Sequence, residues 1–143
     1  MKHRLVGTSF TFGLLALLVW MLAAVPALAS FPGPLAIDTA SEGYSCSNGV
    51  CTFPSGTVGA SYAAPITSTG GSGPTPYTWS VVAGSLPAGL SLTPSYGVYS
   101  AYVYGTPSTA QTSTFTLQVR DGVGDTAQQA FTLTINPKTR HHR

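Results

Sequence analysis

Two segments near the C-terminus, 114–120 and 130–136, alternate apolar and polar residues with a period of two. This alternation places apolar side chains on one face of each segment and is typical of half-buried antiparallel strands. The Gly-rich stretch between them, 121–125, predicts a hairpin loop. We expect the side chains that face the core from this hairpin to be Phe115, Leu117, Val119, Phe131, Leu133 and Ile135.

Shorter runs of β-type residues precede this hairpin, separated by Gly, Pro, Ser and Thr, and no stretch of them has a helical period. Trp79, the largest side chain after residue 30, is expected at the centre of the core. Pro65 confines its own strand to a sheet edge or a bulge. Six or seven short strands at this spacing, with no helix, predict an all-β, two-sheet antiparallel β-sandwich. The runs are 61–67, 77–82, 90–92 and 98–104.

The first 29 residues predict a secretory signal peptide. Lys2 and Arg4 form a basic start, an uninterrupted apolar stretch covers 14–25, and small residues at Ala27 and Ala29 suit cleavage before Ser30. We therefore expect a protein that is secreted or held at the cell surface. The alternative is an uncleaved anchor, because the apolar stretch counted from Phe10 nearly reaches the roughly twenty residues that cross a bilayer.

Charged residues make up 7% of the chain, against about 25% in an average soluble protein. After residue 29, four basic side chains balance four acidic ones, and the histidines in this part are His141 and His142. This low and balanced charge excludes a nucleic-acid-binding face. The scarcity of histidines and acidic residues leaves few of the side chains that acid–base and zinc chemistry usually need. We predict no enzyme activity, no catalytic residue and no cofactor.

Cys46 and Cys51 flank a predicted two-residue turn at Asn48-Gly49. In such a hairpin the two cysteines face each other at a non-hydrogen-bonded pair, within disulfide range. Closing so short a loop stabilises the fold by about 2 kcal/mol. The alternative is a redox or metal pair, although redox pairs usually have two intervening residues and two ligands do not complete a zinc site.

Several motifs follow in order along the chain and resemble the immunoglobulin-like domain of bacterial surface and secreted proteins, related to dystroglycan-type cadherin-like modules. They include Pro76–Val81, Leu86–Leu92, Gly105–Pro107, Phe115–Asp121 and Phe131–Ile135. The resemblance covers 52–136 and implies an all-β, immunoglobulin-like antiparallel β-sandwich of about seven strands, used for adhesion, spacing or ligand presentation. The chain departs from the family where 101–104 separate Ser100 from Gly105. We expect 30–51 to be an extended lead-in with the cysteine hairpin, and 137–143 to be a solvated basic tail.

Tyrosines gather around this insertion and are the candidate binding residues. On an extended strand, Tyr102 and Tyr104 project from the same face about 7 Å apart. Exposed tyrosines are rigid amphipathic platforms that suit sugar rings or a protein partner. The alternative is that tyrosine favours strands and packs against the sheet. The four candidates are Tyr96, Tyr99, Tyr102 and Tyr104.

Asp121 and Asp125 bracket the Gly-rich loop and are candidates for a weak calcium site. Calcium takes six to eight oxygens and usually more carboxylates than two. Side-chain hydrogen bonds to the turn backbone are the alternative for both residues.

The sequence thus predicts a non-catalytic interaction or adhesion module that binds a glycan or a protein at the cell surface or outside the cell. The alternative is a structural extracellular protein that self-associates through its sheet edges. Sheet edges are normally guarded by charge, and 52–136 contain only three charged residues, Arg120, Asp121 and Asp125.

Overall fold

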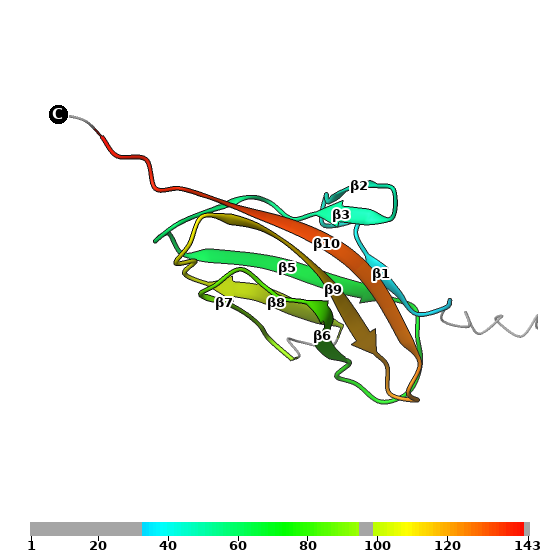
Figure 1. Cartoon of the computed structure of the whole chain (residues 1–143). Coiled ribbons are helices and arrows are strands. Elements are labelled where there is room, and N and C mark those ends of the chain that lie inside the picture. Colours follow the sequence, from blue (N-terminus) through cyan, green and yellow to red (C-terminus); the bar gives the residue numbers. More distant parts are fainter. Residues whose placement is uncertain (1–32, 95–98, 142–143) are drawn as a thin grey trace, which may run out of the picture.

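The two C-terminal strands form the longest pair in the protein, and the rest of the fold is arranged around them (Figure 1). In the computed structural model, which describes residues 33–94 and 99–141, β9 (Gln111–Arg120) pairs with β10 (Thr126–Asn136). Phe115 lies opposite Phe131, and both side chains point inward and are buried. The hairpin predicted from the period-two alternation is therefore confirmed, with the loop at 121–125.

The described residues form ten strands and no helix. The other strands are β1 (Ala36–Asp38), β2 (Ser45–Ser47), β3 (Val50–Thr52), β4 (Gly56–Thr57), β5 (Tyr62–Thr69), β6 (Thr78–Gly84), β7 (Leu90–Leu92) and β8 (Ser100–Gly105).

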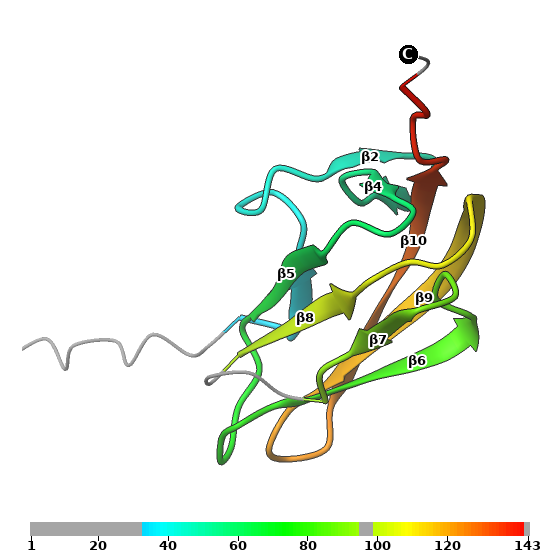
Figure 2. The same ribbon diagram turned by 90° about the vertical axis from the view of Figure 1, so that its left-hand side faces the viewer.

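These strands make two facing sheets (Figure 2). The four-stranded sheet has the order β1-β5-β8-β7 and is antiparallel throughout. The six-stranded sheet has the order β2-β3-β10-β9-β6, and β4 also pairs with β10. Strands β3 and β4 run parallel to β10. The orders β1-β5-β8-β7 and β6-β9-β10 correspond to the ABED and CFG sheets of constant-type immunoglobulin domains, so the predicted fold class is confirmed.

The core contains all the residues expected from the C-terminal hairpin, together with Trp79, which is 3% exposed. Its aromatic cluster also includes Tyr44, from the predicted lead-in and hairpin region, and Phe53, which comes just after that region. The ring of Tyr44 lies 4.7 Å from that of Phe53, and Phe53 lies 4.8 Å from Phe131, measured between ring centroids. The core therefore extends further toward the N-terminus than the sequence indicated.

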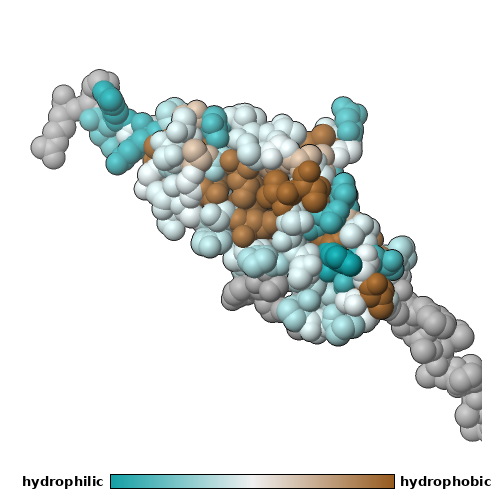
Figure 3. All heavy atoms as spheres, turned by 60° about the horizontal axis from the view of Figure 1, so that its bottom comes forward, coloured by the Kyte–Doolittle hydropathy of each residue, from teal (hydrophilic) through white to brown (hydrophobic). Residues whose placement is uncertain are grey.

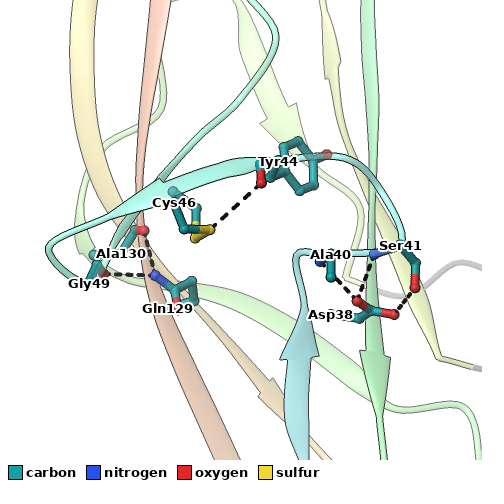
Figure 4. Close-up of a disulfide and its surroundings, with 9 residues drawn as sticks. Asp38, Ala40, Ser41, Tyr44, Cys46, Gly49, Gln129 and Ala130 are labelled. Atoms are coloured by element: carbon teal, nitrogen blue, oxygen red, sulfur yellow. Dashed lines mark hydrogen bonds between the residues drawn. A yellow bond between two sulfur atoms is a disulfide. The ribbon is translucent and has the colours of Figure 1, made fainter.

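The predicted disulfide is confirmed: Cys46 and Cys51 are directly opposed in the β2–β3 hairpin, with an S–S distance of 2.00 Å. Asn48 and Gly49 both have positive φ, as a tight hairpin turn requires. Figure 4 shows the hairpin beside β10, where the Gln129 amide donates a hydrogen bond of 2.8 Å to the Gly49 carbonyl. Both β1 and β3 are strands of the main sheets, so the lead-in and the hairpin complete the sandwich instead of preceding it.

Pro65 occupies a position in β5 where its missing N–H costs nothing. It pairs with Tyr102 of β8 on one side, whereas β1 covers β5 only from Thr67 to Thr69 on the other. The hydroxyl of Tyr44 donates to the Pro65 carbonyl at this open stretch. Pro65 thus lies at a locally unpaired edge, as expected for proline in a strand.

Candidate functional site

The outward face of the four-stranded sheet carries two of the candidate tyrosines. In β8, Ala101 and Val103 are fully buried in the core. Because side chains alternate along a strand, Tyr102 and Tyr104 point to the other side. Tyr104 is 45% exposed and Tyr102 is half-buried. The four residues that interrupt the family pattern therefore form the middle of β8 and supply both tyrosines.

Small side chains surround these tyrosines. Tyr104 pairs with Ala63 of β5 and with Ser91 of β7, and both of these residues are exposed. Tyr102 pairs with Pro65. Directly opposed residues on neighbouring strands are the closest neighbours on a sheet face. Each of the two phenol rings is consequently larger than the side chains of the residues paired with it on β5 and β7.

A chain of hydrogen bonds lies at the other end of the same face. Thr67 of β5 pairs with Ser100 of β8, and their hydroxyl oxygens are 3.2 Å apart. The Thr67 hydroxyl donates to Oε1 of Glu42 at 3.0 Å. Since Thr67 has a single hydroxyl hydrogen, Ser100 must be the donor in its contact with Thr67. The Ser100 hydroxyl hydrogen therefore points to Oγ1 of Thr67, and the Thr67 hydroxyl hydrogen points to the carboxylate of Glu42.

Glu42 lies in a tightly bonded turn after β1, and Figure 4 shows the hydrogen bonds of Ala40 and Ser41 to Asp38 that hold this turn. The carboxylate of Asp38 accepts hydrogen bonds from the N–H groups of Ala40 and Ser41, at 3.1 and 3.0 Å, and from the Ser41 hydroxyl. The bonds from Ser41, its hydroxyl first, hold the pKa of Asp38 below its usual value. The Tyr44 N–H closes the turn on the Thr39 carbonyl at 3.0 Å.

The residue that ends this turn is anchored in the core. Burial, followed by the nearby charge of Glu42, raises the pKa of the Tyr44 phenol, so Tyr44 is neutral at physiological pH. Glu42 is thus held between a capped turn and a buried aromatic ring, and its position on the sheet face is fixed from both sides.

The other candidate tyrosines do not join this face. Tyr99 packs edge-to-face on Tyr77 at one end of the sandwich, with ring centroids 5.0 Å apart. Its carbonyl accepts hydrogen bonds from the N–H and hydroxyl of Ser68, at 3.0 and 3.1 Å. Tyr96 lies outside the described residues. The tyrosines that are close in sequence therefore separate into a face pair and a residue that covers the end of the core.

Asp121 links two loops at the same end of the sandwich as Tyr99. Its carboxylate is 6% exposed and accepts four backbone hydrogen bonds of 2.8–3.1 Å. Burial raises the pKa of Asp121, but these bonds outweigh burial and the net pKa is lowered. The donors are the N–H groups of Ser72, Val123, Gly124 and Asp125.

The calcium site expected at Asp121 and Asp125 remains a prediction. A cation would have to displace N–H donors from Asp121, whereas the Asp125 side chain is exposed. No group of three or more His, Cys, Asp or Glu side chains gathers within residues 33–94 and 99–141. The hydrogen-bonding alternative describes what Asp121 does in the structure.

Sequence reasoning missed Glu42, which is the only glutamate in the chain. It lies in a segment with no strand periodicity, and its neighbours on the face are about 25 and 58 residues away in sequence. The composition alone carried a weak signal, because a lone carboxylate in so uncharged a chain is conspicuous.

No helix within the described part of the chain is long and apolar enough to span a membrane. The basic residues after β10 form an exposed extension that leaves the sandwich (Figure 1).

Comparison with known proteins supports the fold independently. Residues 44–136 match the family model described as "Putative Ig domain". No curated protein matches the chain.

Among solved structures, the chain is similar to an endo-fucoidan hydrolase of glycoside hydrolase family 107, with a TM-score of 0.52 and 14% identity over 71% of this chain. It is also similar to a protein from Bacteroides fragilis described as a putative alpha-galactosidase, with a TM-score of 0.51 and 20% identity over 74% of this chain. The matches span 15% and 18% of the lengths of those two proteins. At these identities the likeness shows a shared fold.

Proposed function

The chain belongs to the Putative Ig domain family, and from this premise we propose that it is an exported, non-catalytic module that binds a glycan on the outward face of its four-stranded sheet. Tyr102 and Tyr104 are the stacking residues. The observation that carries the proposal is their placement on one face of β8, where Tyr104 is 45% exposed opposite Ala63 and Ser91.

The side chains of this face suit a sugar better than a protein. Sugar rings present C–H groups to aromatic faces and hydroxyl groups at their rims, and this face offers two phenols, two hydroxyls and one carboxylate. Protein interfaces are usually anchored by apolar or arginine side chains in pockets. The outward residues Ala63, Pro65 and Ser91 provide no such anchor.

The solved structures that this chain resembles also favour a glycan. An endo-fucoidan hydrolase acts on a polysaccharide, and the part of that protein that resembles this chain is a small share of its length. This likeness supports a domain that accompanies work on polysaccharides. It makes no statement about which sugar this chain binds.

Export and the absence of catalysis belong to the proposal as well. The disulfide Cys46–Cys51 suits an oxidising compartment outside the cytosol. The predicted signal peptide, 1–29, lies outside the described residues. Nucleophilic catalysis by a serine usually needs a histidine base, and the sequence has none between His3 and His141.

The test measures how far the secreted protein migrates in native gels that contain soluble dextran, galactomannan, xylan or hydroxyethyl cellulose, compared with gels that contain no polysaccharide. We expect at least one polysaccharide to slow the wild type, and the double variant Y102S/Y104S to lose that retardation. Val82→Ser is the matched control, because Val82 is 44% exposed but lies on the six-stranded sheet. Equal retardation of the wild type and Y102S/Y104S would contradict the proposal, and so would no retardation by any of the polysaccharides.

Self-association is the second candidate, and an apolar strip at the β6 and β7 edges favours it. Val82 is exposed, and Leu86 and Leu92 are only partly buried against the core. Figure 3 shows apolar atoms gathered on the face that lies at the bottom of Figure 1, where β6 and β7 run.

The edge strands themselves hinder hydrogen-bonded pairing between the sheets of two copies of the protein. β6 is interrupted by a bulge between Val81 and Ala83, and the Trp79 N–H is already bonded to the Pro94 carbonyl at 2.7 Å. The other edge strands, β1, β2 and β7, have three residues each. Bulges and short edge strands are common protections against edge pairing. Association would therefore have to use the apolar strip, and sedimentation velocity of the wild type and Val82→Lys over a range of concentrations would detect it.

A further inference from the structure

We infer that Glu42, supported by Thr67 and Ser100, makes the glycan-binding face selective for neutral, hydroxyl-bearing sugars and against acidic ones. This inference rests on the proposed function and adds the chemical class of the ligand. It follows from the direction of the hydrogen bonds, the charge of the face and the line in which the side chains lie.

The polar end and the aromatic end belong to one surface. Ser100, Tyr102 and Tyr104 are alternate residues of β8, so they point the same way at steps of about 7 Å. A sugar chain that lies along β8 on the two tyrosines therefore extends naturally over Ser100 and reaches Glu42.

The polar end presents an acceptor to such a ligand. Ser100 donates to Thr67 and Thr67 donates to Oε1 of Glu42, so both hydroxyl hydrogens are used within the protein. Oε2 of Glu42 accepts no hydrogen bond within the described part of the chain. A ligand at this end must supply the donor, which a sugar hydroxyl does, and a bond to a charged acceptor is stronger than one to a neutral acceptor.

Within the described residues, no cation lies among the side chains that face outward near Glu42, and those of β5 and β8 from Thr67 to Tyr104 are uncharged. Asp38, which is paired with Thr67 on β1, is a second carboxylate, and its oxygens accept three hydrogen bonds from Ala40 and Ser41. Arg120 belongs to the opposite sheet, where its guanidinium lies against Gly124. A carboxylate or sulfate on the ligand would meet an uncompensated like charge at close range, which is unfavourable at a partly desolvated surface.

The test compares one polysaccharide in two forms: the neutral polysaccharide that retards the wild type most in the native-gel panel, and the same polysaccharide after carboxymethylation of part of its hydroxyls. We expect the wild type to bind the carboxymethylated form at least tenfold more weakly, measured as the association constant. Glu42→Gln keeps an amide oxygen for Thr67 but removes the Glu42 charge, so its discrimination between the two forms should be at least threefold smaller than that of the wild type.

Thr67→Ser is the matched control, because it retains the hydroxyl donor and should discriminate as the wild type does. Equal or tighter binding of the carboxymethylated form by the wild type would overturn the inference, and so would unchanged discrimination in Glu42→Gln. Either result leaves the proposed function intact as long as Y102S/Y104S still abolishes binding. If Y102S/Y104S binds the neutral polysaccharide as well as the wild type does, both the inference and the proposed function are overturned. The same holds if the wild type binds none of the polysaccharides.

Discussion

Gly89 and Gly105 pack backbone against backbone, and the contact leaves no room for a side chain on either residue. A Cβ added to Gly105 would lie 2.3 Å from the Gly89 carbonyl oxygen, and one added to Gly89 would lie 2.1 Å from the Thr106 carbonyl oxygen. Both residues have positive φ, 90° and 135° respectively. The contact fixes the register of β7 on β8, and with it the position of Tyr104 opposite Ser91.

Replacing Gly105 by Ala should therefore destabilise the domain strongly. The substitution combines an unfavourable backbone conformation with a clash against rigid backbone, which together cost about 3 kcal/mol or more. Gly59→Ala is the matched control, because Gly59 also has positive φ but has open space around its Cβ position. It should cost about 1–2 kcal/mol. Urea unfolding measures both values, and equal losses would show that the contact with Gly89 is not tight.

Removing the disulfide should cost less than the Gly105 substitution. The Cys46→Ser/Cys51→Ser variant loses the constraint on a short loop, so the free energy of unfolding should fall by about 2 kcal/mol. The loss should be visible as a lower urea midpoint. Reducing agent should lower the stability of the wild type to that of the variant and leave the variant unchanged; a further drop in the variant would point to a different cause.

Asp121 should make stability depend on acidic pH. Its folded pKa lies below the usual 3.8, so its stabilising effect is present above that value and is lost as the pH falls through the folded pKa. Asp121→Asn removes an acceptor facing four N–H donors and should destabilise the domain at pH 7. The difference from the wild type should shrink as the pH approaches 2.

Asp125→Asn is the control for that experiment, because the Asp125 side chain is exposed in the same loop. It should leave both the stability at pH 7 and the acid limb of the curve nearly unchanged. Urea unfolding at each pH supplies the values. An Asp125 variant as unstable as the Asp121 variant would contradict the role assigned to Asp121.

Calcium should have little effect on stability. The oxygens of Asp121 already accept backbone hydrogen bonds, so a cation would gain few ligands in the loop. We expect the same melting temperature with millimolar calcium and with a chelator. A rise of several degrees with calcium that disappears in Asp125→Asn would instead establish the site predicted from the sequence.

The strands with a clear period of two were predictable because the alternation of apolar and polar residues indicates which side of each strand is buried. Phe115 and Phe131 show this, and so does the turn at Asn48-Gly49, whose sequence dictates its backbone conformation. The motifs around Gly89 and Gly105 indicated the fold family before any contact between them was known.

The rest depended on contacts between residues distant in sequence. Tyr44 and Phe53 lie in stretches too short for a period to be read, and their burial follows from the parallel pairing of β3 with β10. The tyrosine cluster looked continuous in sequence, but Tyr99 lies before β8 and packs on Tyr77, whereas Tyr104 lies in β8 and points out from the sheet; both are 45% exposed. The position of Glu42 beside Thr67 depends on a turn that the sequence pattern does not mark.

The most direct test of the proposed binding face is a titration of the ¹⁵N-labelled protein with the neutral polysaccharide that slows it most in native gels, followed by the amide chemical shifts in NMR spectra. The account predicts that the shifts concentrate on the outward residues of β5, β7 and β8, including Ala63, Ser91 and Tyr104, and extend to Glu42. Shifts confined to β6, β9 and β10, or to the loops around Asp121, would contradict it.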